Sequence, residues 1–178
     1  AWGVTGEILW RGAPPATGCL GCGGCRKTGL CVRKDVVNDI IPKLDDCDGL
    51  VVGSPVHYAA ASGQITGVLD RLFYAASGKL RLKPGAAVVS ARRGGTTAAL
   101  DQLNKYFTIN QMPVVSSRYW NMVHGNTPDE VRQDLEGMAI MRTLGRNMAW
   151  LIKSIAAGKA AGLEEPEAEP AVKTNFIR

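Results

Sequence analysis

Four of the five cysteines lie close together in the sequence, and thiols are well suited to metal and redox chemistry. Their pattern is C-x2-C-x2-C-x5-C, and it is formed by Cys19, Cys22, Cys25 and Cys31. In a cytosolic protein such a cluster indicates metal binding or redox chemistry rather than a disulfide framework. Cys47 stands apart, and we interpret it as a small packing residue.

Three occupancies of this cysteine cluster are open on the residues alone. The surrounding loop is rich in glycine, which lets a chain turn sharply between thiolates that wrap a four-iron four-sulfur cluster. A zinc site made of four cysteines usually uses two separated C-x2-C pairs, whereas three thiols at successive x2 intervals favour the iron–sulfur cluster. Zinc and unmetallated thiols nevertheless stay as alternatives.

The two histidines, His57 and His124, each follow an expected strand and are weak candidates for proton donors. The alternative is a histidine that only hydrogen-bonds a nearby carbonyl. No Ser/His/Asp order points to a hydrolase, and no Walker-type or G-x-G-x-x-G phosphate loop is present.

Alternating strand and helix patterns must position these residues. Short apolar runs predict strands at 7–10, 49–53, 86–90 and 113–116. The run at 49–53 is continuous, as in a strand buried on both faces. Capping residues and apolar stripes predict helices that begin after Asp35, after Ser62, at Thr96 and after Thr127. This alternation is typical of an α/β domain with a parallel sheet.

Composition limits the class of protein. The 178 residues are 46% hydrophobic, which suits one domain, assigned to 1–163 with a cysteine-rich loop at 18–34 and a tail at 164–178. The net charge of +5 is scattered and only 6% of residues are aromatic, so we expect no nucleic-acid binding. No apolar run approaches the roughly 20 residues of a membrane span. We therefore expect a cytoplasmic protein that does not bind membranes.

Several motifs occur together in one order. They are Gly53-Ser54-Pro55-Val56-His57-Tyr58, Ser62-Gly63-Gln64, Asp70-Arg71, Arg92-Arg93-Gly94-Gly95-Thr96, Tyr119 to Gly125, and Thr174 to Arg178. Together with the cysteine loop, they make the chain resemble the flavodoxin-like NAD(P)H-dependent FMN reductases and iron–sulfur flavoproteins. The resemblance covers nearly the whole chain. It implies a doubly wound parallel sheet in the order 2-1-3-4-5.

The resemblance also implies a flavin site. In open parallel sheets, ligands lie beyond the carboxyl ends of the strands, and two of the motifs follow predicted strands. The expected FMN contacts are Ser54, Pro55, Val56, His57, Tyr58, Ala91, Arg92, Arg93, Gly94 and Gly95. Tyr58 joins the two histidines as a weak catalytic candidate. By the same resemblance, the four clustered cysteines would hold a four-iron four-sulfur cluster.

One departure from the family pattern concerns the first strand and the phosphate loop that follows it. The sequence begins at the position of the family's second strand, so we expect an N-terminal strand–loop–helix to be absent from it. Asp70 and Arg71 are interpreted as a polar pair on the helix surface, in a surface ion pair or an intersubunit contact.

The resulting hypothesis is an FMN-dependent oxidoreductase. It would take electrons from NAD(P)H or a protein donor and pass them to flavin, quinone or other small acceptors, through a four-iron four-sulfur cluster if one is bound. A homodimer or homotetramer is expected. The alternatives are a non-catalytic electron carrier of the flavodoxin type and a zinc-stabilised binding module without flavin.

Overall fold

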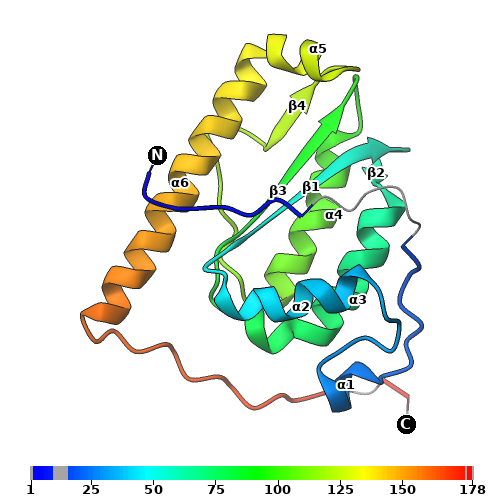
Figure 1. Cartoon of the computed structure of the whole chain (residues 1–178), viewed down its shortest axis with the longest axis vertical. Helices are drawn as coiled ribbons and strands as arrows, with labels where there is room; N and C mark the ends of the chain where they lie inside the picture. Colours follow the sequence, from blue (N-terminus) through cyan, green and yellow to red (C-terminus); the bar gives the residue numbers. More distant parts are fainter. Residues whose placement is uncertain (1, 10–15, 175, 178) are drawn as a thin grey trace.

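The computed structural model describes residues 2–9, 16–174 and 176–177, and its centre is a four-stranded sheet (Figure 1). The strand order is β2-β1-β3-β4. β1, β3 and β4 are parallel, whereas β2 pairs with β1 in an antiparallel hairpin. The strands span Leu50–His57 (β1), Ala60–Ala61 (β2), Gly85–Ala91 (β3) and Met122–His124 (β4).

Helices cover both faces of the sheet (Figure 1). They span Cys25–Thr28 (α1), Val36–Asp46 (α2), Gly63–Leu80 (α3), Thr96–Ile109 (α4), Pro128–Gln133 (α5) and Leu135–Ala160 (α6). The larger core lies between one face and α2, α3 and α4, where Leu103 and Phe107 are fully buried. A smaller core joins Ala86 of β3 to Leu144 and Met148 of α6. The α/β fold class is therefore confirmed.

Two helix starts are confirmed by their caps. The Asp35 carboxylate accepts a hydrogen bond from the Val37 N–H at 3.1 Å, and the Ser62 hydroxyl accepts one from Gln64 at 3.3 Å. Each cap satisfies a backbone donor that the first turn of a helix leaves unpaired. The short polar side chains before the apolar stripes therefore set the starts of α2 and α3.

The predicted strand at 7–10 is wrong for residues 7–9, and Trp10 lies outside the described residues. Ile8 is 93% exposed, and no described strand pairs with this segment. Glu7 instead pairs with Lys43 of α2 at 2.8 Å. A short apolar run without a neighbouring strand gains neither burial nor backbone pairing, so it does not form a strand.

The predicted strand at 113–116 is also wrong. Only Val114 forms an isolated bridge, to Gly85, before the chain leaves the edge of β3 and returns as β4. The Ser117 hydroxyl donates a hydrogen bond to the Ile140 carbonyl of α6 at 2.8 Å. This side-chain bond ties the connecting segment to α6 before the chain returns to the sheet as β4.

The single helix expected after Thr127 is two helices. Thr127 caps α5 by accepting from the Glu130 N–H at 3.2 Å, as predicted. The chain then breaks at Asp134, whose ψ of 79° is not helical, and the carboxylate of Asp134 caps α6 through the Gly137 N–H at 2.8 Å. Leu135, at the first position of α6, is exposed.

β1 is buried on one face only, contrary to the expectation from its continuous apolar run. Val52 is buried, whereas the neighbouring Val51 is 52% exposed. α6 packs on β3 and β4, and within the described residues no strand pairs with residues 50–55 on the edge away from β3. β1, β3 and β4 occupy the positions of strands 3, 4 and 5 in the order 2-1-3-4-5.

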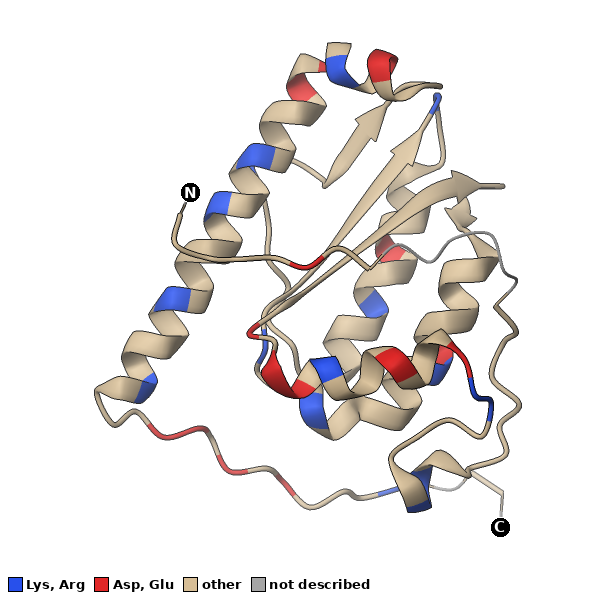
Figure 2. Cartoon of the chain, viewed as in Figure 1, with Lys and Arg blue, Asp and Glu red and all other residues tan. Residues whose placement is uncertain are grey.

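Charges are dispersed over the described chain (Figure 2). Lys and Arg residues are spread along α1, α2 and α6, and Glu residues follow one another in the tail. Residues 164–174 form neither helix nor strand, and Arg81 holds the start of this segment through the Pro166 carbonyl at 2.5 Å. None of the helices described here is both long and apolar enough to cross a membrane.

Candidate functional site

The carboxyl ends of the three parallel strands meet at one edge of the sheet, and the predicted flavin contacts lie there (Figure 1). His57 ends β1, Ala91 ends β3 and His124 ends β4. Ala91 is directly paired with His124, and Pro55 with Ser90. Because the strands are parallel and in register, residues far apart in the sequence form a single edge, which we call the carboxyl edge.

Two loops of the carboxyl edge are locked against each other by their backbones. Tyr58 and Ala59 turn the chain between β1 and β2 with φ of 51° and 59°, values that are uncommon for residues other than glycine. Gly95 precedes α4 with φ of 88°, and a Cβ there would lie 2.7 Å from the Ala59 Cα. Only glycine allows this approach, so Gly95 sets the spacing of the two loops.

The two loops leave polar groups exposed. His57, Tyr58, Arg92, Arg93 and Gly94 are exposed at the carboxyl edge. Their imidazole, guanidinium and backbone N–H groups are available to a planar, anion-bearing ligand. An open hollow of about 400 Å³ lies between the ends of β3 and β4 and helices α5 and α6.

Ser54 behaves differently from the other predicted flavin contacts. It is buried, and its hydroxyl accepts a hydrogen bond from the Ser62 N–H at 2.9 Å while it donates to the Pro55 carbonyl at 2.8 Å. The hydroxyl thus ties β1 to the first turn of α3. Ser54 therefore supports the backbone of the edge, and its predicted contact with the flavin stays a prediction.

His124 is held by Asp134. The Asp134 carboxylate accepts from the His124 backbone N–H at 2.8 Å, and the same oxygen lies 3.7 Å from the imidazole Nδ1. The hydrogen bond from the Gly137 N–H is the main reason that the pKa of Asp134 is lower than its ordinary value of 3.8, and the N–H of His124 acts in the same direction. An ionised carboxylate therefore fixes the backbone of this histidine and lies close to its ring.

The four clustered cysteines line one pocket. Gly21 and Gly23 turn the loop with φ of 65° and 68°, which is the role expected of glycine between ligands. Cys19 and Cys22 are exposed, whereas Cys25 and Cys31 are partly buried. We call this hollow the cysteine pocket.

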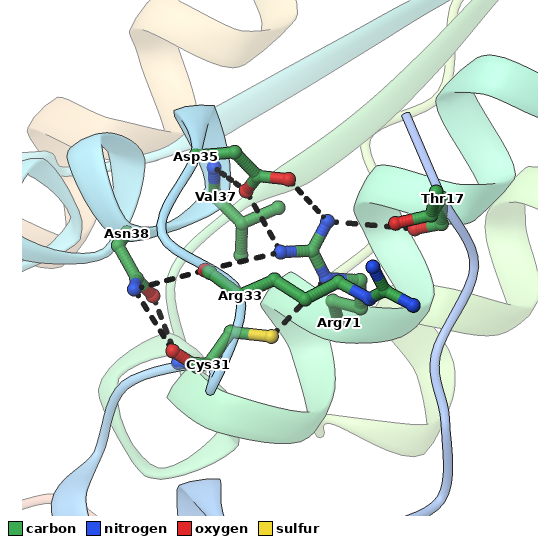
Figure 3. A network of polar contacts seen from close by, with 7 residues as sticks. All are labelled: Thr17, Cys31, Arg33, Asp35, Val37, Asn38 and Arg71. Carbon is green, nitrogen blue, oxygen red and sulfur yellow. Dashed lines mark hydrogen bonds and ion pairs between the residues drawn. The ribbon is translucent and has the colours of Figure 1, made fainter. Parts of the chain in front are cut away.

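Arg71 reaches the cysteine pocket from α3 (Figure 3). Its Nε donates to the Cys31 sulfur at 3.2 Å, and its two terminal nitrogens each donate to an oxygen of Asp35 at 2.7 Å. The side chain is only 1% exposed. The hydrogen bonds to Asp35 are the main reason that the pKa of Arg71 is raised above its ordinary value.

Asn38 fixes the backbone on the other side of Cys31 (Figure 3). Its Oδ1 accepts from the Cys31 N–H at 2.8 Å, and its Nδ2 donates to the carbonyls of Cys31 at 2.9 Å and Arg33 at 3.1 Å. Both backbone groups of Cys31 are therefore bonded to one side chain. This end of the cysteine loop is held against α2 before any ligand binds.

The interpretation of Asp70 and Arg71 as a pair on the helix surface is wrong. Arg71 is buried, and Asp70 accepts a hydrogen bond from the Tyr106 hydroxyl at 2.5 Å. The sequence carried a signal for this: Arg71 follows Val68 by three residues and precedes Leu72, so it shares their buried stripe. Asp35 is the predicted cap of α2, but its pairing with Arg71 does not follow from the sequence pattern.

The cysteine pocket suits an anionic group with several metal ions. Arg26, Arg33 and Arg71 line it together with the thiols, and the buried Nε of Arg33 has no hydrogen-bond partner among the described residues. A buried donor without a partner is costly, so an acceptor in the pocket would relieve it. The described His, Cys, Asp and Glu residues form no group of three around a single ion. A cluster instead takes one thiolate per iron, with the sulfurs set further apart.

Solved structures share the fold. A flavodoxin-type WrbA-like protein from Agrobacterium tumefaciens superposes with a TM-score of 0.55 at 18% identity, covering 65% of this chain and 73% of that chain. An oxidoreductase from Corynebacterium diphtheriae gives 0.52 at 24% identity, covering 69% and 65%. The protein therefore has a flavodoxin-like α/β fold.

Sequence comparisons identify the family. The family model for NADPH-dependent FMN reductase matches residues 14–127. An iron–sulfur flavoprotein of Methanocaldococcus jannaschii is 30% identical over 161 residues, which are 86% of this chain and 83% of the relative. An iron–sulfur flavoprotein of Archaeoglobus fulgidus is 29% identical over 164 residues, covering 90% and 77%. The chain belongs to the NADPH-dependent FMN reductase family, and we describe it as an FMN-dependent oxidoreductase.

Proposed function

We propose that the protein binds FMN at the carboxyl edge, holds a four-iron four-sulfur cluster on Cys19, Cys22, Cys25 and Cys31, and transfers electrons between a donor and a small acceptor. The observation that carries the proposal is the cysteine pocket, in which four thiols and three arginine side chains line one hollow. Four thiolates with neighbouring cations match the donor set and the negative charge of such a cluster. The relatives named iron–sulfur flavoproteins support the same reading.

At the carboxyl edge, the chain would bind and orient FMN. Bound FMN supplies hydride and single-electron chemistry, and the protein sets its position and electronics. Backbone N–H groups of Arg92 to Gly95 would face the carbonyl-bearing rim of the ring, with the positive charge of Arg92 and Arg93 near by. His57 is exposed at the end of β1, and Asp134 holds His124 in place, so each is positioned to hold a proton near the ring.

The cysteine pocket and the carboxyl edge lie in different parts of the folded domain. In Figure 1, α1 of the cysteine loop is at the bottom, whereas the ends of β1, β3 and β4 point toward the top. Electrons would therefore travel far within one subunit. We propose a homodimer or homotetramer in which the cysteine pocket of one copy faces the carboxyl edge of another.

Anaerobic purification with a spectrum and metal analysis tests the two cofactors. Bound oxidised flavin gives peaks near about 370 and 450 nm, and a broad shoulder near about 400 nm that dithionite bleaches indicates the cluster. Four iron and four sulfide per chain are expected. Colourless protein with one zinc per chain would overturn the proposal in favour of a zinc-stabilised module.

Cysteine variants assign the ligands. Replacing Cys22 or Cys31 with alanine is expected to remove most of the iron and sulfide, because a cluster of this type needs four thiolates. Cys47→Ala is the matched control, since the Cys47 thiol lies outside the pocket and donates to the Leu44 carbonyl. Equal iron loss in Cys47→Ala would contradict the assignment.

Kinetics separate an enzyme from an electron carrier. We propose that NADH or NADPH, or a reduced protein donor, supplies electrons and that flavins, quinones or other small molecules accept them. NADH and NADPH oxidation would be followed with quinone and ferric acceptors. Turnover with either nucleotide supports a reductase, whereas exchange with redox proteins alone supports a flavodoxin-type carrier.

A further inference from the structure

Arg71 is the one side chain in the described part of the protein with a hydrogen bond to the sulfur of a clustered cysteine. Its Nε donates to Cys31 Sγ at 3.2 Å (Figure 3). Among the described residues, the other donor to a sulfur of this set is a backbone group, the Gly21 N–H, which lies 3.4 Å from Cys19 Sγ. The guanidinium of Arg71 therefore contacts one of the four thiols, that of Cys31.

The rest of the network keeps the Nε–H aimed at that sulfur. Asp35 binds both terminal nitrogens of Arg71, and the carbonyls of Thr17 and Arg33 accept further hydrogen bonds at 3.4 Å each. With the guanidinium 1% exposed, water does not compete for the donor. Hydrogen bonds to charged partners in such surroundings are stronger than those in water.

We propose that Arg71 raises the reduction potential of the iron–sulfur cluster through its bond to Cys31. This inference rests on the proposed function, because it requires the four thiolates to hold a cluster. Reduction adds one electron, and so one negative charge, to the group that the thiolates hold. A hydrogen bond to a ligand sulfur becomes stronger as that negative charge grows, so it favours the reduced form.

Asp35 determines the net positive charge that lies beside the Cys31 sulfur. The carboxylate offsets much of the positive charge of Arg71, so in the native protein the directed Nε–H acts chiefly as a hydrogen-bond donor. Removing the donor and removing the carboxylate therefore have opposite effects on the potential. Loss of the donor destabilises the reduced cluster, whereas loss of the carboxylate leaves a net positive charge beside the sulfur.

Three variants test the inference by anaerobic redox titration, in which dithionite supplies one electron per cluster. Arg71→Lys keeps a positive charge that can pair with Asp35 but lacks the Nε–H donor. We expect about a tenfold less favourable reduction, which is a potential about 59 mV lower than that of the native protein. Asp35→Asn keeps a cap for α2 and is expected to shift the potential upward. Lys27→Gln, which removes an exposed charge from α1, is expected to shift it by less than a third as much.

The readouts separate this inference from the proposed function. Iron and sulfide are counted first: native protein without a cluster would overturn both. Native protein with a cluster, together with an Arg71→Lys potential equal to the native value, would overturn the role of Arg71 alone. If Arg71→Lys does not fold or load, Asp35→Asn decides by its sign. An upward shift with amide exchange at Cys31 as slow as in the native protein supports the proposal. An unchanged or lower potential, or an upward shift accompanied by faster exchange at Cys31, overturns it, because a loosened loop also raises the potential by admitting water.

Discussion

We expect the ion pair between Arg71 and Asp35 to contribute strongly to the free energy of unfolding. We also expect replacement of Asp35 to cost more than replacement of Arg71. Arg71 is 1% exposed and Asp35 is 34% exposed in their side chains. We consider Arg71→Met, which leaves a carboxylate that water can reach, and Asp35→Ala, which leaves a guanidinium that water cannot reach. Asp35→Ala should lose more stability than Arg71→Met, because the buried guanidinium is left without the carboxylate that balances its charge.

The magnitudes follow from these exposures. Removing one partner of a buried ion pair costs about 3–5 kcal/mol of the free energy of unfolding. Arg71→Met belongs at the lower end, about 3 kcal/mol, since water partly solvates the remaining Asp35. Asp35→Ala belongs at the upper end, about 5 kcal/mol, and this variant also loses the cap of α2.

Urea denaturation near neutral pH, followed by tryptophan fluorescence, measures these losses. Lys79→Ala is the control, because the Lys79–Asp45 pair has the same charges but lies on the surface, with exposures of 34% and 55%. Its loss should not exceed about 1 kcal/mol. The reasoning is refuted if Arg71→Met costs no more than Lys79→Ala, or if Asp35→Ala costs less than Arg71→Met.

Three further predictions concern other parts of the fold. N–H groups at the start of α6 and in β4 hold the pKa of Asp134 below 3.8, so its contribution to stability is present above pH 3.8 and is lost as the pH falls further. In Asp134→Asn, the free energy of unfolding measured by urea denaturation should therefore fall less steeply as the pH is lowered below 3.8. Gly95→Ala should lose at least about 1 kcal/mol, whereas Gly78→Ala, on an exposed helix position, should gain up to about 1 kcal/mol; equal changes would argue against strain at Gly95. Burial, and then the hydrogen bond to Asp70, raise the pKa of Tyr106 above 10.0, so the stability that this tyrosine contributes is present below pH 10 and lost above it. Tyr106→Phe should cost about 1 kcal/mol at neutral pH and show a flatter alkaline limb; a limb as steep as that of the native protein would count against this assignment.

Local signals predicted the elements whose interactions are local. Asp35 and Ser62 cap helices because their side chains reach backbone groups two residues away, which a sequence shows directly. The strand at 86–90 was also predicted, since a buried central strand needs apolar residues throughout. The strand at 113–116 was not correct, because only Val114 pairs with β3 before the segment bonds to α6, and contacts with a helix that comes later in the chain are not visible in a local pattern.

In the candidate site, too, features that depend on neighbouring residues could be predicted, whereas contacts between distant residues could not. The four closely spaced cysteines line one pocket, and His57 and His124 end two strands at the carboxyl edge. The strand predicted before His124, at 113–116, was nevertheless wrong, because β4 begins only at Met122. The role of Arg71 was missed because a buried arginine is rare and its partner, Asp35, is 36 residues away. Tertiary contacts, rather than local patterns, determine which charges become buried.

The link between Cys31, Asn38 and Arg71 also governs how the protein opens. Cys31 is bonded through its backbone to Asn38 of α2 and through its sulfur to Arg71 of α3. Detaching the end of the cysteine loop therefore breaks bonds to α2 and α3 at the same time. Amide hydrogen exchange at Cys31 and Val37 should thus proceed at one common rate, as a single cooperative unit, while the exposed Cys19 end exchanges much faster.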